Sequence, residues 1–181
     1  MNDPRLRALA ERAEMREQPP ARIDWAQVAA EMGAEPPADY RELVDRFGVG
    51  SFDHYFDLYG PGDPHYPLGD GYDWDEYFKD DWRLQPELAP QRAGASEATA
   101  VRWGGTEDAH IVFWLVEPDR DPAEWLIGLQ GHDGIECEFF ELTTVAFLLA
   151  YANGTLESAL LRPWDPAESF AYRRYEEIRN S

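Results

Sequence analysis

The chain has 181 residues, 44% of them hydrophobic and 14% aromatic, which is the composition of a folded domain with one core. It holds 36 acidic against 16 basic residues, a formal net charge of −20, and a field of this sign disfavours nucleic acids and anionic membranes as partners. No apolar run approaches the roughly 20 residues that span a bilayer, and the N-terminus lacks the apolar core of a secretory signal. The single cysteine, Cys137, excludes an internal disulfide, so we expect a soluble cytoplasmic protein.

The acidic excess is concentrated in two windows. Residues 39–81 hold 12 acidic and three basic residues, a net of −9, and residues 104–141 hold ten acidic residues and one basic residue, again a net of −9. A surface of this sign attracts basic proteins. The alternative is that the charge serves solubility or reflects a salt-tolerant organism, and composition leaves both interpretations open.

The first helix is predicted over residues 3–17, where Leu6, Leu9 and Ala13 form a narrow apolar face. Because this face is small, we expect a loosely docked N-terminal arm. The proline-rich stretch 18–20 breaks the helix and is predicted to be a linker.

Two short amphipathic helices follow in tandem. The first is capped by Asp24 and ends at Gly33, and the second runs from Pro37 to Phe47 and ends at Gly48. In each, apolar residues recur at offsets 0, 3, 4 and 7, as on one face of an α-helix. These residues are Trp25, Val28, Ala29 and Met32 in the first helix and Tyr40, Leu43, Val44 and Phe47 in the second. Helices this short need a sheet beneath them.

The segment 52–59 changes to a period of two and predicts one strand. The side chains expected to face the core are Phe52, His54, Phe56 and Leu58. Those expected to point outward, as an acidic and aromatic stripe, are Asp53, Tyr55, Asp57 and Tyr59. We assign Tyr55, Asp57 and Tyr59 as candidate partner-binding residues.

The segment 73–82 predicts a further helix, in which Asp73 and Glu76 have the spacing of a capping box. Its aromatic residues, which could line one helical face, are Trp74, Tyr77, Phe78 and Trp82. Two interpretations remain open: a helix packed over the edge of the sheet, or an exposed aromatic plate in an acidic field, as at protein-binding surfaces. On the second interpretation the candidate partner-binding residues are Asp73, Trp74, Asp75 and Glu76.

The second half of the chain is rich in predicted strands, which lie at 99–103, 110–116, 125–130 and 135–139. Turns are predicted at Gly104-Gly105 and at 131–134. In the last strand the alternation places Ile135, Cys137 and Phe139 on the core side. A helix capped by Thr143 or Thr144 and closed by Gly154 follows, and the tail is predicted to end in a helix that folds back.

Two stretches together resemble the SUKH superfamily, which groups bacterial immunity proteins with a fungal regulator of cell-wall synthesis. Residues 37–52 resemble the family's proline–acid–tyrosine helix, which ends in Phe-Gly and leads into a strand. Residues 103–108, followed by Phe113-Trp114-Leu115, resemble its Trp-Gly-x-Thr turn and Phe-Trp strand. At Ala109-His110 the chain departs from the Gly-Asp or Gly-Gly-like pair of the family. The similarity covers about residues 23–156.

The resemblance implies a single α+β domain with a mixed, mostly antiparallel sheet and helices packed against it. We expect this SUKH-like domain over residues 21–160, between an N-terminal helical arm and linker (1–20) and a C-terminal helical tail (161–181). The resemblance also implies an immunity protein that binds and neutralises a cognate bacterial toxin, in many cases a nuclease. The acidic windows agree with this, because toxins that act on nucleic acid tend to be basic.

The sequence contains no GxSxG, HExxH, P-loop, GxGxxG or CxxC motif. His65 and His132 lie beside Asp63 and Asp133, but two possible ligands without a third make a poor metal site. We therefore expect no catalytic residues, no metal and no cofactor. Two alternatives remain: a regulatory scaffold with several partners, like the fungal relative, or an enzyme with an unrecognised site.

The leading hypothesis is a stoichiometric inhibitor whose acidic, aromatic surface occludes the active site of a basic toxin. Glu107 and Asp108, in the predicted turn region after Trp103, complete the candidate partner-binding set. All nine candidates are chosen for charge, aromatic character and inferred exposure.

Overall fold

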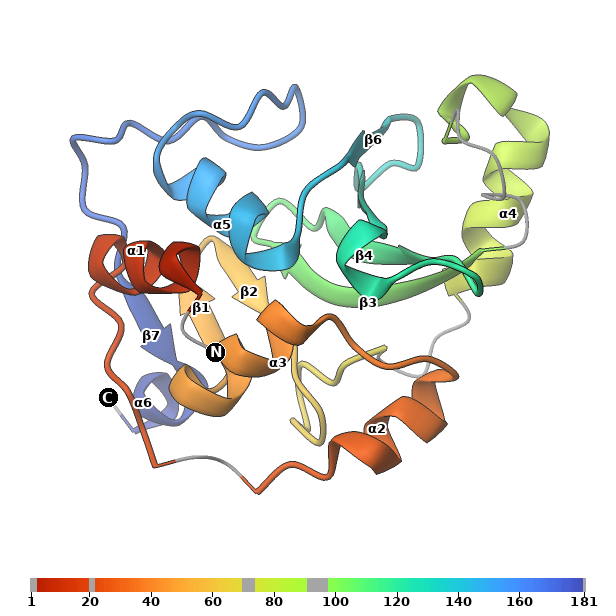
Figure 1. The fold of residues 1–181 in the computed structure, drawn as a ribbon. Coiled ribbons are helices and arrows are strands. Elements are labelled where there is room, and N and C mark those ends of the chain that lie inside the picture. The colour runs from red at the N-terminus through yellow and green to blue at the C-terminus, as the bar shows by residue number, and fades with distance from the viewer. Residues whose placement is uncertain (1–2, 20–21, 70–73, 91–97, 181) are drawn as a thin grey trace.

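Seven strands form one antiparallel sheet in the order β6-β5-β4-β3-β2-β1-β7, and helices pack against it in a single α+β domain (Figure 1). The helices are α1 (Pro4–Arg12), α2 (Trp25–Met32), α3 (Ala38–Phe47), α4 (Trp74–Leu84), α5 (Thr144–Ala152) and α6 (Tyr175–Arg179), with the 3₁₀ turns η1 (Pro86–Leu88) and η3 (Pro122–Glu124). The strands are β1 (Gly50–Phe52), β2 (Phe56–Leu58), β3 (Thr99–Thr106), β4 (Ile111–Val116), β5 (Leu126–Gln130), β6 (Cys137–Phe140) and β7 (Tyr172–Arg174). This computed structural model describes residues 3–19, 22–69, 74–90 and 98–180, without the side chains of 74–77 and 81. The predicted α+β class, with helices packed against one sheet, is confirmed, and every strand pair in the sheet is antiparallel.

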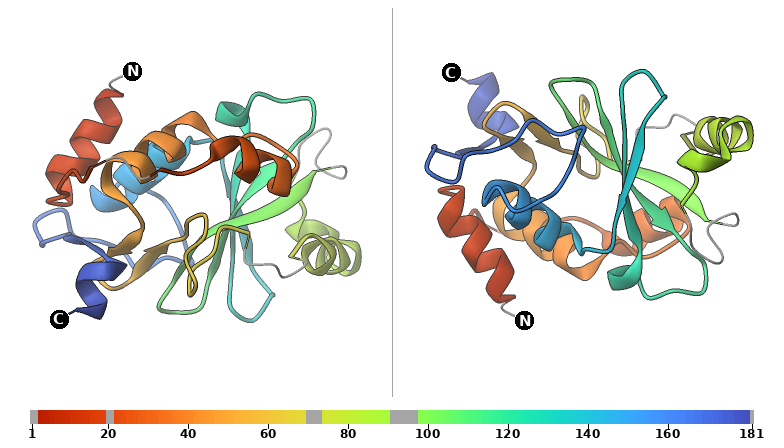
Figure 2. Two further views of the ribbon diagram at one scale, coloured as in Figure 1. Left: turned by 90° about the horizontal axis from the view of Figure 1, so that it is seen from below. Right: turned by 90° about the horizontal axis from the view of Figure 1, so that it is seen from above.

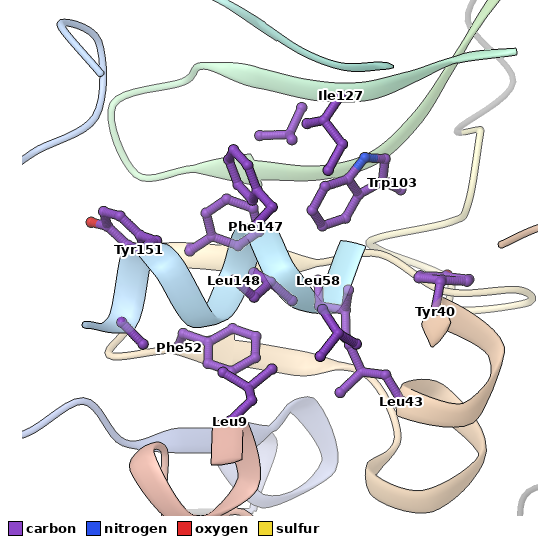
Figure 3. Packing of buried hydrophobic residues seen from close by; sticks show 14 of the residues in the cluster. Leu9, Tyr40, Leu43, Phe52, Leu58, Trp103, Ile127, Phe147, Leu148 and Tyr151 are labelled. Carbon is purple, nitrogen blue, oxygen red and sulfur yellow. The ribbon is translucent and has the colours of Figure 1, made fainter. Parts of the chain in front are cut away.

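Helices α1, α3 and α5 cover one face of the sheet and enclose the main core. Figure 3 shows Leu9 of α1, Leu43 of α3 and Leu148 of α5 gathered around the strand residues Phe52 and Leu58. All five side chains are fully buried, so apolar burial fixes these helices to the sheet.

Helix α4 covers the opposite face of the sheet, as Figure 2 shows. The Phe78 ring stacks on Phe113 of β4 with ring centroids 4.3 Å apart, and Trp82 lies against Phe139 of β6. Gly128 of β5 leaves room for Phe113, because a Cβ there would lie 2.1 Å from its ring. Both faces of β4 are therefore buried, as predicted for a central strand.

The helix ends follow the predicted capping chemistry. The Asp24 carboxylate accepts a hydrogen bond from the backbone N–H of Gln27 (3.1 Å), and Gly33 ends α2 with a left-handed φ of 79°. The Thr143 hydroxyl accepts a hydrogen bond from the backbone N–H of Ala146 (3.4 Å) at the start of α5. The four predicted core residues of α3 are all buried.

The prediction of one strand over 52–59 is wrong, because the chain reverses at Asp53 and His54. Both residues have a left-handed backbone (φ 51° and 55°), and the backbone N–H of Tyr55 donates to the carbonyl of Phe52 (3.0 Å). Asp and His adopt this conformation more readily than most residues, so a tight hairpin forms without a glycine. His54 is therefore exposed in a turn and does not face the core.

The prediction of a turn at Gly104-Gly105 is also wrong, since β3 continues through both glycines after a register shift between Arg102 and Gly104. Glycine is required there by close packing. A Cβ on Gly104 would lie 2.9 Å from the carbonyl oxygen of Asp57 on the neighbouring strand. The chain reverses later, over 107–109, where Ala109 has a φ of 61°.

The N-terminal and C-terminal segments contribute to the same core and sheet. Leu6 and Leu9 are fully buried, so α1 is not loosely docked. The tail ends in a helix as predicted, but it also contains β7, which no sequence pattern indicated and which pairs with β1. The backbone N–H of Tyr172 donates to the carbonyl of Ala13 (2.8 Å), and that of Arg174 donates to the Glu177 carboxylate (3.2 Å).

Candidate functional site

Three turns lie at the same end of the sheet. They are the β1–β2 turn (53–55), the β3–β4 turn (107–109) and the β5–β6 turn (131–136), and the antiparallel registers of β1 to β6 align them. We name the carboxylates of these turns the acidic rim: Asp53, Glu107, Asp108, Asp133 and Glu136. Because neighbouring strands lie about 4.8 Å apart, the rim extends over about 24 Å across six strands.

The acidic rim differs from the rest of the acidic surface in its exposure and pairing. Its carboxylates are exposed, except for Asp53, which is half-buried. Among the residues that the structure describes, none of the five forms an ion pair. They have no direct ion-pair partner among the described residues, although the guanidinium of Arg162 lies nearby over the Tyr55 ring. Their negative charges reinforce one another along one edge.

Many other acids of the two charged windows have structural roles. The Asp39 carboxylate accepts a hydrogen bond from the backbone N–H of Val145 (2.7 Å), and Asp45 accepts one from the indole N–H of Trp25 (3.0 Å). Glu138 accepts hydrogen bonds from the segment that follows α5. These acids hold helices and loops in place, so net charge alone overstates the surface available to a basic partner.

Tyr55 lies beneath the acidic rim and is buried, contrary to the predicted exposure. The backbone N–H of Glu107 donates to the Tyr55 carbonyl (2.8 Å), and the guanidinium of Arg162 lies over the Tyr55 ring, 4.8 Å from its centroid. Burial, with a smaller contribution from the neighbouring Asp108, raises the pKa of the Tyr55 hydroxyl. Tyr55 thus supports the turn that presents Glu107 and Asp108, and the structure brings these three candidates together.

Asp57 and Tyr59 do not form the predicted exposed stripe. Tyr59 is buried, its carbonyl accepts a hydrogen bond from the Tyr40 hydroxyl (2.6 Å), and Arg102 lies over its ring at 4.5 Å. Asp57 is half-buried on β2, directly opposite Ser51 of β1. Burial raises the pKa of the Asp57 carboxyl. The prediction treated residues 52–59 as one strand with an exposed face. Because the chain reverses at Asp53 and His54, Asp57 and Tyr59 instead face other parts of the protein.

The candidates near α4 are only partly described. Asp73 lies outside the described residues, and Trp74, Asp75 and Glu76 form the first turn of α4, where side chains are not described. The predicted exposed aromatic plate is wrong for Phe78 and Trp82, which are buried against the sheet. The alternative of a helix packed over the edge of the sheet is right that Phe78 and Trp82 are packed, but α4 covers a face of the sheet and not its edge.

Three members of the acidic rim were missed as functional candidates. Asp133 lies in a stretch whose turn composition was recognised, and turn exposure would have been a sufficient signal. Asp53 and Glu136 were assigned to strands, but β1 ends at Phe52 and β6 begins only at Cys137, so both acids lie in turns. Ile135 was predicted to face the core but is 60% exposed beside Glu136, since β6 begins only at Cys137.

The histidines do not assemble a metal site. His110 is buried with its Nε2 atom 3.1 Å from the carbonyl oxygen of Leu160, and its ring centroid is 6.0 Å from that of exposed His132. In the described part of the chain, no group of three or more His, Cys, Asp or Glu side chains could hold a metal ion. The Asp63 carboxylate accepts a hydrogen bond from the backbone N–H of His65 (2.9 Å), so these two residues lie close together because they form a turn.

None of the helices in the described ranges is both long and apolar enough to cross a membrane. Comparison of the chain with protein-family models, with curated proteins and with solved structures found no match.

Proposed function

We propose that the protein is a stoichiometric inhibitor that binds a basic toxin, of nuclease type, through the acidic rim and occludes its active site. The observation that supports this most directly is the row of exposed carboxylates that lack ion pairs with described residues along one end of the sheet. The resemblance to the SUKH superfamily supports the same proposal independently of the charge.

The dimensions of the acidic rim suit a protein partner. A row of about 24 Å across the strands matches one side of a standard interface, which buries about 800 Å² on each partner. Cationic residues that line a nuclease's substrate cleft would meet the carboxylates that replace the substrate's phosphates. Ile135, which is 60% exposed between Asp133 and Glu136, supplies an apolar contact within this row.

Charge in such a complex should act mainly on the rate of association. Complementary fields raise association rate constants to about 10⁸ M⁻¹s⁻¹ at low salt, and salt screens this gain over a Debye length of about 10 Å at 0.1 M. Dissociation should depend on buried apolar contacts such as Ile135.

The first experiment identifies the partner. The tagged protein is used to capture binding proteins from its native organism, and each captured basic protein is co-expressed with and without it. Rescue of growth from a single toxic protein supports neutralisation. Recovery of many proteins with rescue from none would contradict the proposal and favour the scaffold alternative.

The second experiment tests the surface. The double variant Glu107→Lys/Glu136→Lys reverses two rim charges whose side chains have no described hydrogen bond. Glu11→Lys/Glu87→Lys makes the same charge change at exposed positions of α1 and η1 and serves as the matched control. We expect the rim variant to slow association with the toxin by about tenfold or more at low salt, with a flatter salt dependence, and the control to change it much less. Equal effects of the two variants would contradict binding at the rim.

A further inference from the structure

Helix α2 is held to the protein mainly at its first residue. The indole N–H of Trp25 donates to the Asp45 carboxylate (3.0 Å), and the Trp25 ring meets the edge of Tyr40 with centroids 6.1 Å apart. None of the side chains of α2 is fully buried, and Val28 and Met32 on its inward side are only half-buried. Figure 1 shows α2 at the margin of the fold. Its apolar face is therefore incompletely covered.

Two cavities lie beneath the exposed end of this face, one on each side of Met32. The first has a volume of about 460 Å³, and its apolar lining comes from Val28, Met32, Pro61, Pro67, Leu68 and Val101. The second has a volume of about 390 Å³, and its apolar lining comes from Met32, Ala34, Val116, Pro118, Pro122 and Trp125. We name the two together the α2 cleft. A cavity of about 150 Å³ already holds benzene, so each has room for a leucine or phenylalanine side chain.

The charged groups at the α2 cleft are mainly acidic. Glu31 lines the first cavity, and Glu35 and Glu117 line the second together with Arg120. Glu117 and Arg120 form an ion pair (2.8 Å), and Glu35 forms one with Arg41. With Arg41 counted, three carboxylates face two guanidiniums, and Glu31 is the carboxylate that has no ion pair among the described residues. The remaining charge at the cleft is negative, so an occupant with positive charge beside its apolar group is favoured over an acidic one.

We infer that the α2 cleft receives an apolar side chain of the basic partner, leucine-like or phenylalanine-like, that is flanked by lysine or arginine. This inference rests on the proposed function and adds a second contact surface to it. A few side chains seated in pockets supply most of the binding energy in protein complexes, and the surrounding charges add specificity. A second copy of this chain would bring its own net charge of −20 against the acidic lining, which disfavours self-association there.

The test uses Met32 as a local reporter, because the chain has only three methionines. The protein is labelled with ¹³C at its methionine methyl groups and titrated with three 12-residue peptides. One peptide has a central leucine flanked by lysines, the second has alanine in place of the leucine, and the third has glutamates in place of the lysines. We expect the first peptide to shift the Met32 methyl resonance, with at least tenfold weaker effects of the other two. The methyl group of Met15, which packs beside α1, should not shift.

Variants that fill one cavity of the α2 cleft, each paired with a control, test the cleft directly. Val28→Phe adds volume inside the first cavity, and Ala30→Phe adds the same ring on the exposed side of α2. We expect the first to weaken peptide binding at least tenfold and the second to leave it unchanged. If Val28→Phe disturbs folding, Ala34→Leu narrows the second cavity and should act in the same direction.

Three outcomes would overturn the inference. They are an unmoved Met32 resonance with all peptides, an equal response to the glutamate-flanked peptide, which would indicate a site for any apolar group, and a concentration-dependent dimer whose formation shifts Met32. Toxin binding that is lost in the rim variant but unchanged in Val28→Phe would remove the cleft from the interface and leave the proposed function in place. If the protein does not rescue cells from a toxin but still binds the leucine peptide, the proposed function fails while the α2 cleft remains a binding site.

Discussion

Asp39 provides the most direct test of how the acidic residues are used. Its carboxylate accepts a hydrogen bond from the backbone N–H of Val145, at 2.7 Å, in the first turn of α5, and it lies in the first turn of α3. One carboxylate thus stabilises the positive ends of both α3 and α5, through a hydrogen bond between residues 106 positions apart in sequence. Asp39→Ala removes the acceptor and leaves the Val145 N–H without it.

The expected cost of Asp39→Ala follows from these contacts. A hydrogen bond to a charged group contributes about 1.5–3 kcal/mol, and a charge at a helix N-terminus contributes about 0.3–1 kcal/mol. We expect a loss of about 2–4 kcal/mol in the free energy of unfolding, which corresponds to a fall in Tm of about 5–15 °C for a chain of this length. Asp39→Asn keeps an oxygen acceptor without the charge and should lose about half as much.

Urea unfolding followed by circular dichroism measures these differences. Glu42→Ala is the control, since Glu42 forms a half-buried i,i+4 ion pair with Arg46 within the same helix, and such pairs contribute only about 0.3–0.5 kcal/mol. A loss below about 1 kcal/mol for Asp39→Ala would refute the assignment of this acid to a structural role.

Two further predictions concern the second face of the sheet. Gly128→Ala should lower the free energy of unfolding by about 1–3 kcal/mol, because the added Cβ would lie 2.1 Å from the Phe113 ring. Phe113→Leu in the same chain should recover part of that loss. If urea unfolding instead shows that the losses of the two substitutions simply add, the contact is not responsible. Asp57→Asn should stabilise the protein at pH 7, since burial raises the folded-state pKa of this carboxyl and its charged form is therefore disfavoured in the fold. The destabilising effect of the Asp57 charge decreases as pH falls through the raised folded-state pKa and disappears below the unfolded-state pKa of about 4. The stability advantage of Asp57→Asn should therefore become smaller in unfolding measurements at lower pH. An advantage that does not change with pH would contradict this reasoning.

The helices could be predicted from the sequence because their signals are local. The apolar positions of α3, the Asp24 cap and the glycine that ends α2 all act within a few residues of one another. The hairpin at Asp53 and the continuation of β3 through Gly104 depend instead on conformations and packing that local patterns do not encode.

The candidate site was harder to predict than the fold, because exposure is a property of tertiary structure. Glu107 and Asp108 were selected correctly as exposed acids, whereas Tyr55 and Tyr59 were selected for the same reason and are buried. A two-residue period distinguishes two faces of a strand, but it does not say whether another part of the chain covers the second face. Only the registers of neighbouring strands bring the turns of the acidic rim to one end of the sheet.

The position of β7 has a consequence for synthesis of the chain. Strands β1 to β6 are neighbours in the sheet in the order in which they are synthesised. Strand β7 pairs with β1, so Gly50 cannot pair with Arg174 until almost the whole chain has been made. Until then β1 has an open edge, of the kind that pairs with other chains. Once β7 is in place, Ala13 and Glu177 occupy two of the hydrogen-bonding groups on its outer side. A nascent chain that stalls before residue 172 therefore exposes a template for aggregation that the finished protein conceals.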